Sequence, residues 1–189
     1  MAAIIGWLAL SFAVSFLLGS IPWGVIVSKL AYHKDIRDEG SGNIGTTNAF
    51  RAMGKVGGAL VFVLDFGKGL LSGWLAFWFW APLAGWAEID YSWPAQRCLQ
   101  RLKASGGCGR WPGPRLAGCT LGHIFSPWLK FKGGKGIAVA AACLVFVFGP
   151  CFLIEIAVFA LGIAVTRCVS VGSIAAAVIC GARLYFLLG

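Results

Sequence analysis

The stretch IIGWLALSFAVSFLLGSIPWGVI, at residues 4–26, carries no charged side chain and decides the fold class. An α-helix rises about 1.5 Å per residue, so about 20 apolar residues cross the hydrocarbon core of a bilayer. A second stretch, VGGALVFVLDFGKGLLSGWLAFWFW at residues 56–80, is also long enough, although Asp65 and Lys68 interrupt it. Both stretches are predicted to be membrane-spanning helices.

The composition of the whole chain agrees with a membrane protein. Of its 189 residues, 59% are hydrophobic and 12% are charged, and the mean hydropathy is +0.82. Soluble domains carry about 25% charged residues, and disordered chains are poorer in apolar residues still, so both classes are excluded. Further apolar stretches at residues 136–149, 152–166 and 169–181 predict additional helices. The fold class is therefore predicted to be all-α, a polytopic integral membrane helical bundle that forms one domain over residues 1–189.

Positive charge is in excess, with sixteen Lys and Arg against seven Asp and Glu. In a soluble protein this excess would suggest nucleic-acid binding, whereas in a membrane protein Lys and Arg gather in cytoplasmic loops. Residues 29–55 hold five basic and three acidic side chains, and Lys130, Lys132 and Lys135 mark a second basic segment. We therefore expect no nucleic-acid partner, an N-terminus outside the membrane, and both basic segments in the cytoplasm.

Residues 88–119 do not fit a membrane bundle. They hold five basic residues, three prolines and three cysteines, with little apolar periodicity. Such charges and prolines would be stranded in hydrocarbon. The segment is therefore atypical and disrupts the pattern of spans, which leaves only residues 116–129 as a short crossing between the second apolar stretch and the second basic segment.

The seven cysteines of the chain include no Cys-x-x-Cys pair and no neighbouring cluster of histidines. Neither zinc ligation nor a disulfide framework is predicted from such spacing. We expect no metal and no cofactor.

Residues 41–48, with the sequence SGNIGTTN, form the first candidate binding motif, and Arg51 follows closely. Glycines let backbone N–H groups converge on an anion, short polar side chains add donors, and arginine offers a bidentate fork. A flexible loop also favours glycine and asparagine, so this motif alone leaves an ordinary loop and a phosphate site open.

Residues 131–136, with the sequence FKGGKG, form the second candidate motif. They lack the Gly-x4-Gly-Lys-Ser/Thr spacing of nucleotide-binding loops, which disfavours ATP or GTP hydrolysis. The motif precedes an apolar helix, whose amides and positive dipole end would attract an anion. Simple anchoring on the cytoplasmic side explains Lys130 and Lys132 well, and Lys135, between glycines, less well.

Two pairs of polar residues and one histidine could also carry chemistry. Asp65 and Lys68 are three residues apart on one helix face, so they are expected either to pair with each other or to contact a ligand. His33 and Asp38 have the His-x4-Asp spacing of one class of membrane acyltransferases, but two residues at one spacing are better explained by chance. His123 is predicted to be a polar interfacial residue without a nucleophilic Ser or Cys partner.

Five strings occur together in one order: GSIPWG at 19–24, SGNIGTTN at 41–48, LDFGKG at 64–69, GHIF through KG at 122–136, and TRCVSVGS at 166–173. In this combination the chain closely resembles the bacterial acyl-phosphate-dependent glycerol-3-phosphate acyltransferases. The resemblance covers residues 1–87 and 120–182. It implies an all-helical bundle of seven spans, of which six or fewer are expected to be intact in this chain.

The resemblance also implies an activity. Such an enzyme moves a fatty acyl group from acyl phosphate to the 1-position of sn-glycerol 3-phosphate and gives lysophosphatidic acid and phosphate, a step of phospholipid biosynthesis. The partners implied are these two substrates, membrane lipid and, as an open addition, an acyl-phosphate-forming enzyme; the location implied is the bacterial inner membrane. Because acyl phosphate is already activated, no nucleophile or general base is assigned.

Carried over position by position, the family motifs imply a set of substrate- and phosphate-binding residues. The first motif contributes six, the second four, and two other strings the remainder, which gives Ser41, Gly42, Asn43, Thr47, Asn48, Arg51, Gly133, Gly134, Lys135, Gly136, Lys68, Ser170 and Ser173.

Two departures from the family pattern leave alternatives open. The basic string with His and Asn that the family carries near its end has no match before Gly189, and residues 88–119 do not resemble the third span, which is what a local disturbance of the reading frame would produce. A small anion transporter or channel, or an inactive remnant of the family, therefore remains as an alternative to the enzyme.

Overall fold

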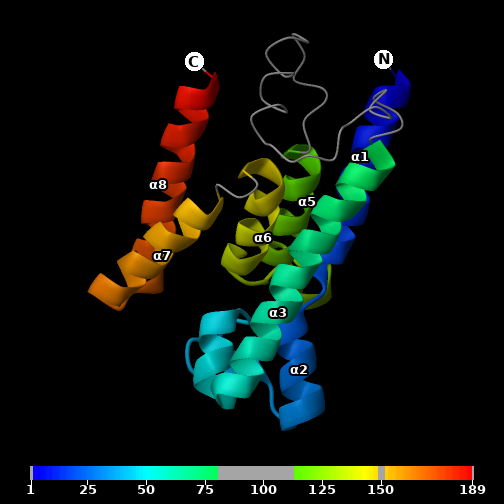
Figure 1. The fold of residues 1–189 in the computed structure, drawn as a ribbon. Coiled ribbons are helices and arrows are strands. Elements are labelled where there is room, and N and C mark those ends of the chain that lie inside the picture. The colour runs from blue at the N-terminus through cyan, green and yellow to red at the C-terminus, as the bar shows by residue number, and fades with distance from the viewer. Residues whose placement is uncertain (1, 81–112, 149–151, 189) are drawn as a thin grey trace. The chain divides into compact units, whose positions relative to one another are not determined.

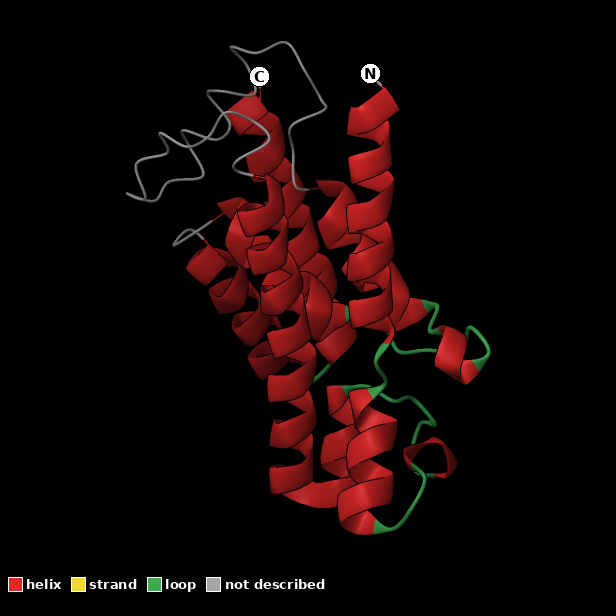
Figure 2. Cartoon of the chain, turned by 90° about the vertical axis from the view of Figure 1, so that its right-hand side faces the viewer, coloured by secondary structure: helices red, strands yellow, loops and turns green. Residues whose placement is uncertain are grey.

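The computed structural model describes residues 2–80, 113–148 and 152–188, and all regular elements in these ranges are helical (Figures 1 and 2). Seven α-helices and two short 3-10 helices follow one another as α1 (Ala2–Ser20), α2 (Trp23–Tyr32), η1 (Ile36–Asp38), α3 (Thr46–Trp80), α5 (Gly113–Ile124), η4 (Pro127–Leu129), α6 (Ile137–Phe148), α7 (Phe152–Thr166) and α8 (Val169–Leu188). The all-α prediction is confirmed.

Two stretches of the described chain are long and apolar enough to cross a membrane, residues 5–32 and 46–75. The first is not one straight helix, because the chain breaks between α1 and α2 at Ile21-Pro22. The second extends further than expected, since α3 begins at Thr46, inside the segment predicted to be a polar loop. Its first turns are set off by a kink at Gly54, where φ is 72° and ψ is −168°.

The chain divides into two compact units. The first contains α1, α2, α3, α5 and α6 as far as Cys143, and the second contains the rest of α6 from Leu144 together with α7 and α8. The single domain predicted for residues 1–189, the number of spans and the character of residues 88–112 stay predictions. Residues 88–112 lie outside the described residues, whereas residues 113–119 of the atypical segment belong to helix α5.

Helices α1 and α5 of the first unit pack backbone against backbone through glycines. A Cβ added to Gly122 would lie 2.0 Å from the carbonyl oxygen of Phe16, and one added to Gly19 would lie 2.0 Å from that of Cys119. Gly118, four residues before Gly122, faces α1 in the same way. Small residues at this spacing allow close helix contact within a membrane, where burial of apolar surface offers little drive for association.

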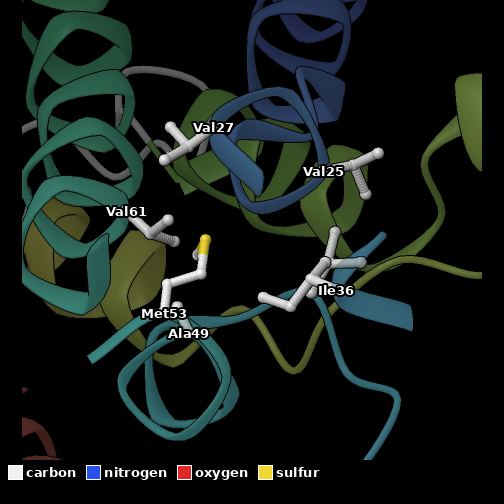
Figure 3. Close-up of a cluster of buried hydrophobic side chains, with 7 residues drawn as sticks. Val25, Val27, Ile36, Ala49, Met53 and Val61 are labelled. Atoms are coloured by element: carbon white, nitrogen blue, oxygen red, sulfur yellow. The ribbon is translucent and has the colours of Figure 1, made fainter. Parts of the chain in front are cut away.

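A cluster of buried apolar side chains lies between α2, η1 and α3. Figure 3 shows its labelled members on α2, η1 and α3, with Val25 and Val27 on opposite sides of α2. The cluster consists of Val25, Val27, Ile36, Ile44, Ala49, Met53 and Val61, and Leu129 of η4 packs against it. It therefore joins the segments that contain the two glycine motifs.

Helices α7 and α8 form the core of the second unit. Gly162 and Gly172 bring them together, since a Cβ on Gly162 would lie 2.7 Å from the Cα atom of Gly172. The turn between them is made by Arg167, whose φ is 54°, and by the Thr166 hydroxyl, which accepts a hydrogen bond from the Cys168 N–H at 3.2 Å.

The packing of α1 on α5 predicts that Gly122→Ala destabilises the protein, because the new methyl group would overlap the backbone of Phe16 in α1. Overpacking of this kind costs about 1–3 kcal/mol. The matched control is Gly67→Ala in α3, where no described atom lies within 4 Å of the added Cβ. There the change should be neutral or stabilising by about 0.5–1 kcal/mol, because alanine favours helix over glycine. Thermal unfolding in detergent micelles, followed by circular dichroism, compares the two; equal losses of Tm would contradict the packing argument.

Candidate active site

Asn48 organises the first glycine motif from within. Its side chain is 2% exposed, and its amide nitrogen lies 2.9 Å from the carbonyl oxygens of Glu39 and Asn43 and 3.1 Å from that of Ile36. Its amide oxygen accepts a hydrogen bond from the Ser41 N–H at 2.9 Å. All polar atoms of this side chain are therefore engaged by the loop itself, so its contribution to binding would be to hold the loop in shape.

The rest of the first motif faces outward at the start of α3. Ser41, Gly42 and Thr47 are exposed, and Gly42 has a φ of 68°, a conformation that side chains rarely adopt. The Asn43 side chain accepts a hydrogen bond from the Gly45 N–H at 2.9 Å, just before the first turn of the helix. The amides of Asn48 and Ala49 donate to the Gly45 carbonyl oxygen, whereas those of Thr46 and Thr47, at the start of α3, have no backbone acceptor among the described residues.

The two arginines near this motif differ in their availability. Arg37 is held by Asp35, with the two groups 2.6 Å apart at their closest, and the pairing lowers the pKa of the Asp35 carboxyl and raises that of the Arg37 guanidinium. Arg51 is exposed and takes part in no ion pair with any described residue. Arg51 is thus the arginine of this region that is available to an anion.

The second glycine motif is fixed to the end of α5 by backbone hydrogen bonds. The Gly133 N–H donates to the carbonyl oxygen of Ile124 at 2.9 Å, and the Gly134 N–H donates to that of His123 at 3.1 Å. A Cβ on Gly133 would lie 2.0 Å from the His123 carbonyl oxygen, so only glycine fits there. Gly136, with a φ of 72°, leads directly into α6, and Lys135 before it is exposed.

A buried polar cluster lies among the apolar helices of the first unit. The ammonium nitrogen of Lys68 lies 2.8 Å from an oxygen of Asp65, 2.9 Å from Nδ1 of His123 and 2.7 Å from the carbonyl oxygen of Ile21. The three side chains are at most 4% exposed. Of the two alternatives expected for Asp65 and Lys68, the structure shows the ion pair, and His123 is buried beside both groups and is not an interfacial residue.

Polar groups at and beside this cluster donate hydrogen bonds to the chain where the first span is broken. Pro22 has no N–H to continue the helix, so carbonyl groups at the end of α1 need other donors. The Ser126 hydroxyl donates to the Ser20 carbonyl oxygen at 2.6 Å, and the Trp128 ring N–H donates to the Ser20 hydroxyl at 2.8 Å. Lys68 serves the next carbonyl, that of Ile21. Sequence reasoning missed these contacts, although a proline inside an otherwise apolar span was a signal for them.

Both glycine motifs therefore end at helix N-termini, α3 at Thr46 and α6 at Ile137, and both are tied to one apolar cluster through Ile44 and Leu129. Such N-termini combine free amides with a positive dipole end and attract phosphate or carboxylate groups. The arrangement can hold two anionic groups without a metal ligand or an acid-base pair.

The remaining predicted site residues lie in the second unit. Ser170 is exposed near the start of α8, and the Ser173 hydroxyl donates to the carbonyl oxygen of Val169 at 2.8 Å. A role for either serine in binding stays a prediction. In the first unit, His33 is the C-cap residue of α2 and has the left-handed conformation, with a φ of 53°. Asp38 lies in η1.

The buried ion pair predicts a non-additive double-mutant cycle. Lys68→Met leaves the Asp65 carboxylate buried without its counter-charge, which is expected to cost about 3–5 kcal/mol of unfolding free energy. The double variant Asp65→Asn with Lys68→Met removes both charges and should lose clearly less. Unfolding of the purified protein in detergent measures the double variant and both single variants, Lys68→Met and Asp65→Asn. A double variant as unstable as the sum of the two single variants would show that the pair does not interact.

Comparison with known proteins agrees with this architecture. The family model described as glycerol-3-phosphate acyltransferase matches residues 9–188. A protein of that name from Lacticaseibacillus casei (strain BL23) is 39% identical over 166 residues, which are 88% of this chain and 68% of the relative. Another, from Geobacillus kaustophilus (strain HTA426), is 37% identical over 171 residues, or 89% of this chain and 72% of the relative.

Solved structures are similar as well. The crystal structure of PlsY, an integral membrane glycerol 3-phosphate acyltransferase, in its glycerol 3-phosphate form aligns with a TM-score of 0.71 and 30% identity over 95% of this chain and 76% of that one. Its lysophosphatidic acid form gives a TM-score of 0.69 and 29% identity over the same shares. Because sequence and fold agree over nearly the full length, the chain belongs to the glycerol-3-phosphate acyltransferase family of integral membrane proteins.

Proposed function

We propose that this protein transfers a fatty acyl group from acyl phosphate to the 1-hydroxyl of sn-glycerol 3-phosphate, giving lysophosphatidic acid and phosphate for phospholipid synthesis. The observation that carries the proposal is the pairing of two glycine loops, each leading into a helix N-terminus and each presenting an exposed cation, Arg51 and Lys135. Two anion-binding loops on one apolar cluster suit a reaction in which both substrates carry phosphate. The names of the relatives support the same acceptor.

The chemistry requires placement more than covalent help. The hydroxyl oxygen attacks the acyl carbonyl carbon, the bond from that carbon to the phosphate oxygen breaks, and the hydroxyl proton ends on the phosphate product. Acyl phosphate is a mixed anhydride with a good leaving group, so binding both substrates in reacting distance and stabilising the developing charge supplies most of the rate. This accounts for a site in which no nucleophile is assigned.

Within the site the residues divide between contact and support. Arg51 offers a planar fork to phosphate oxygens, whereas Lys135 offers a point charge beside backbone amides. Ser41, Gly42, Asn43 and Thr47 line the exposed side of the first loop, and Gly133, Gly134 and Gly136 shape the second. Asn48 acts through the contacts that hold the first loop, and Lys68 acts through His123, beside which the second loop lies. Ser170 and Ser173 are proposed as further binding residues on the family motif alone.

The protein is proposed to lie in the bacterial inner membrane, with its N-terminus outside and both glycine loops in the cytoplasm. The excess of basic side chains in those loops supports this orientation. Large apolar side chains exposed on α1 and α3, such as Leu17 at 55% and Val63 at 62%, suit contact with lipid and with the acyl chain. A cytoplasmic site would receive acyl phosphate from an enzyme that forms it.

One observation favours a second candidate, a small anion transporter or channel. The first span is broken at Ile21-Pro22, and broken helices line the ion sites of many transporters. In this chain, however, the carbonyl groups at the break are occupied by Lys68 and Ser126. The enzyme is therefore the better-supported function, and an inactive family member is the third outcome of the test.

Purified protein in detergent, given acyl phosphate and radiolabelled glycerol 3-phosphate, is expected to form lysophosphatidic acid. Lys135→Ala should reduce kcat/KM about 100-fold, because the loss of one group that stabilises developing charge typically costs at least that much. Lys132→Ala is the matched control, because it removes the same charge from an exposed side chain three residues before Lys135. Lys132 is expected only to anchor the segment, so this variant should retain activity within about threefold.

Three results separate the candidates. Equal effects of the two lysine substitutions would contradict the assigned role of Lys135. Absence of product from folded wild-type protein would overturn the enzyme, and reconstituted vesicles would then distinguish a transporter, which takes up labelled phosphate, from an inactive protein, which does not.

A further inference from the structure

We propose that His123 is a positioning residue for the second glycine loop, and that Lys68 and Asp65 orient its ring instead of binding substrate. This proposal rests on the proposed function, since it says how the Gly133–Gly136 loop of that site is held. In this proposal the three buried side chains of Asp65, Lys68 and His123 together hold the loop, and none of them contacts the reacting atoms.

The first step concerns whether the Lys68 ammonium group can still bind a substrate. A lysine ammonium group has three N–H donors and no acceptor. Its nitrogen is already within 3 Å of three partners, an oxygen of Asp65, Nδ1 of His123 and the carbonyl oxygen of Ile21. The side chain is also buried. Two hydrogen bonds, to Ile21 and His123, and the ion pair with Asp65 therefore surround the ammonium group, and burial leaves it no open path to a phosphate group.

The second step fixes the chemical form of the His123 ring. Because Lys68 can only donate, Nδ1 of His123 must accept, and the ring proton of a neutral imidazole must then sit on Nε2. Lys68 thus determines both the tautomer and the direction of the ring, as the partner of one ring nitrogen commonly does for histidine.

The third step is the contact between the ring and the loop. A Cβ built on Gly134 would lie 2.3 Å from Nε2 of His123 and 3.2 Å from both ring carbons beside it, and these are its three nearest atoms. The loop therefore lies directly on the Nε2 edge of the ring. The Gly134 N–H also donates to the His123 carbonyl oxygen, so one residue holds the loop by its backbone and supports it by its side chain. Lys135 is the next residue along.

The experiment is a rescue cycle on this contact. Gly134→Ala should push the ring and the loop apart and raise the KM for glycerol 3-phosphate roughly 10- to 100-fold, the size of effect that a displacement of about 1 Å has on a bound substrate. His123→Asn keeps an acceptor for Lys68 but removes the Nε2 edge, and should raise KM only about threefold. In the double variant the shorter side chain makes room for the alanine, so KM should return to within about threefold of wild type.

Gly133→Ala provides the matched control. Its Cβ would meet backbone oxygens of His123 and Ile124 rather than the ring, so His123→Asn cannot relieve that clash. The pair Gly133→Ala with His123→Asn should therefore be at least as impaired as Gly133→Ala alone. Rescue of both glycine variants, or of neither, would overturn the proposal. So would a His123→Asn variant that loses kcat while KM is unchanged, because the ring would then be a catalytic residue.

The same cycle is also followed by thermal unfolding in detergent, which does not depend on turnover. If wild-type protein forms no lysophosphatidic acid, the proposed function fails, whereas recovery of Tm in the Gly134→Ala and His123→Asn double variant would still support the ring contact. Additive losses of Tm would refute the contact whatever the enzyme assay shows.

Discussion

The ammonium group of Lys68 at the break in the first span is the contact on which the first unit depends. A charged side chain in the centre of a membrane helix costs about 2.5–3.5 kcal/mol on insertion scales. Beside Pro22, the Ile21 carbonyl oxygen accepts the Trp23 N–H at 3.1 Å and has room for a second donor. Lys68 donates to the Ile21 carbonyl oxygen, and Asp65 supplies the counter-charge of the ammonium group, so both buried polar groups are stabilised. The break is thereby fixed in place, and α1, α3 and α5 are joined at one level.

Close helix packing follows from the same requirement. Lys68 reaches Ile21 and His123 only because α1, α3 and α5 approach one another closely, and Gly19 and Gly122 permit that approach. Larger residues at these positions would separate α1 from α5 and leave Lys68 without its contacts to Ile21 and His123. The glycines and the polar cluster are therefore one structural feature, although they lie on different helices.

The sequence predicted the elements that depend on local pattern. The apolar spans, the helical class and the pairing of Asp65 with Lys68 at three residues' separation all follow from periodicity and spacing. It did not predict that α3 starts at Thr46, because the polar composition of its first turns is typical of a loop, and their helical form depends on Ala49 and Met53 packing into the apolar cluster.

Contacts between distant residues were also out of reach. Lys68 and His123 are 55 residues apart, and Trp128 and Ser20 are 108 apart, so no spacing rule connects them. The two glycine motifs were recognisable as anion loops from their residue types. That Asn48 turns inward to hold its loop, while Arg51 stays exposed, depends on the path of the backbone.

The bond from the Trp128 ring N–H to Ser20 has a consequence for depth in the membrane. The rest of the Trp128 ring is largely exposed, with the residue 67% accessible, and Phe131 is 63% accessible. Aromatic rings with a polar edge settle at the level of the lipid headgroups. Because the loop is bonded to the broken span and carries Trp128, this bond limits how far the second glycine motif can move along the membrane normal.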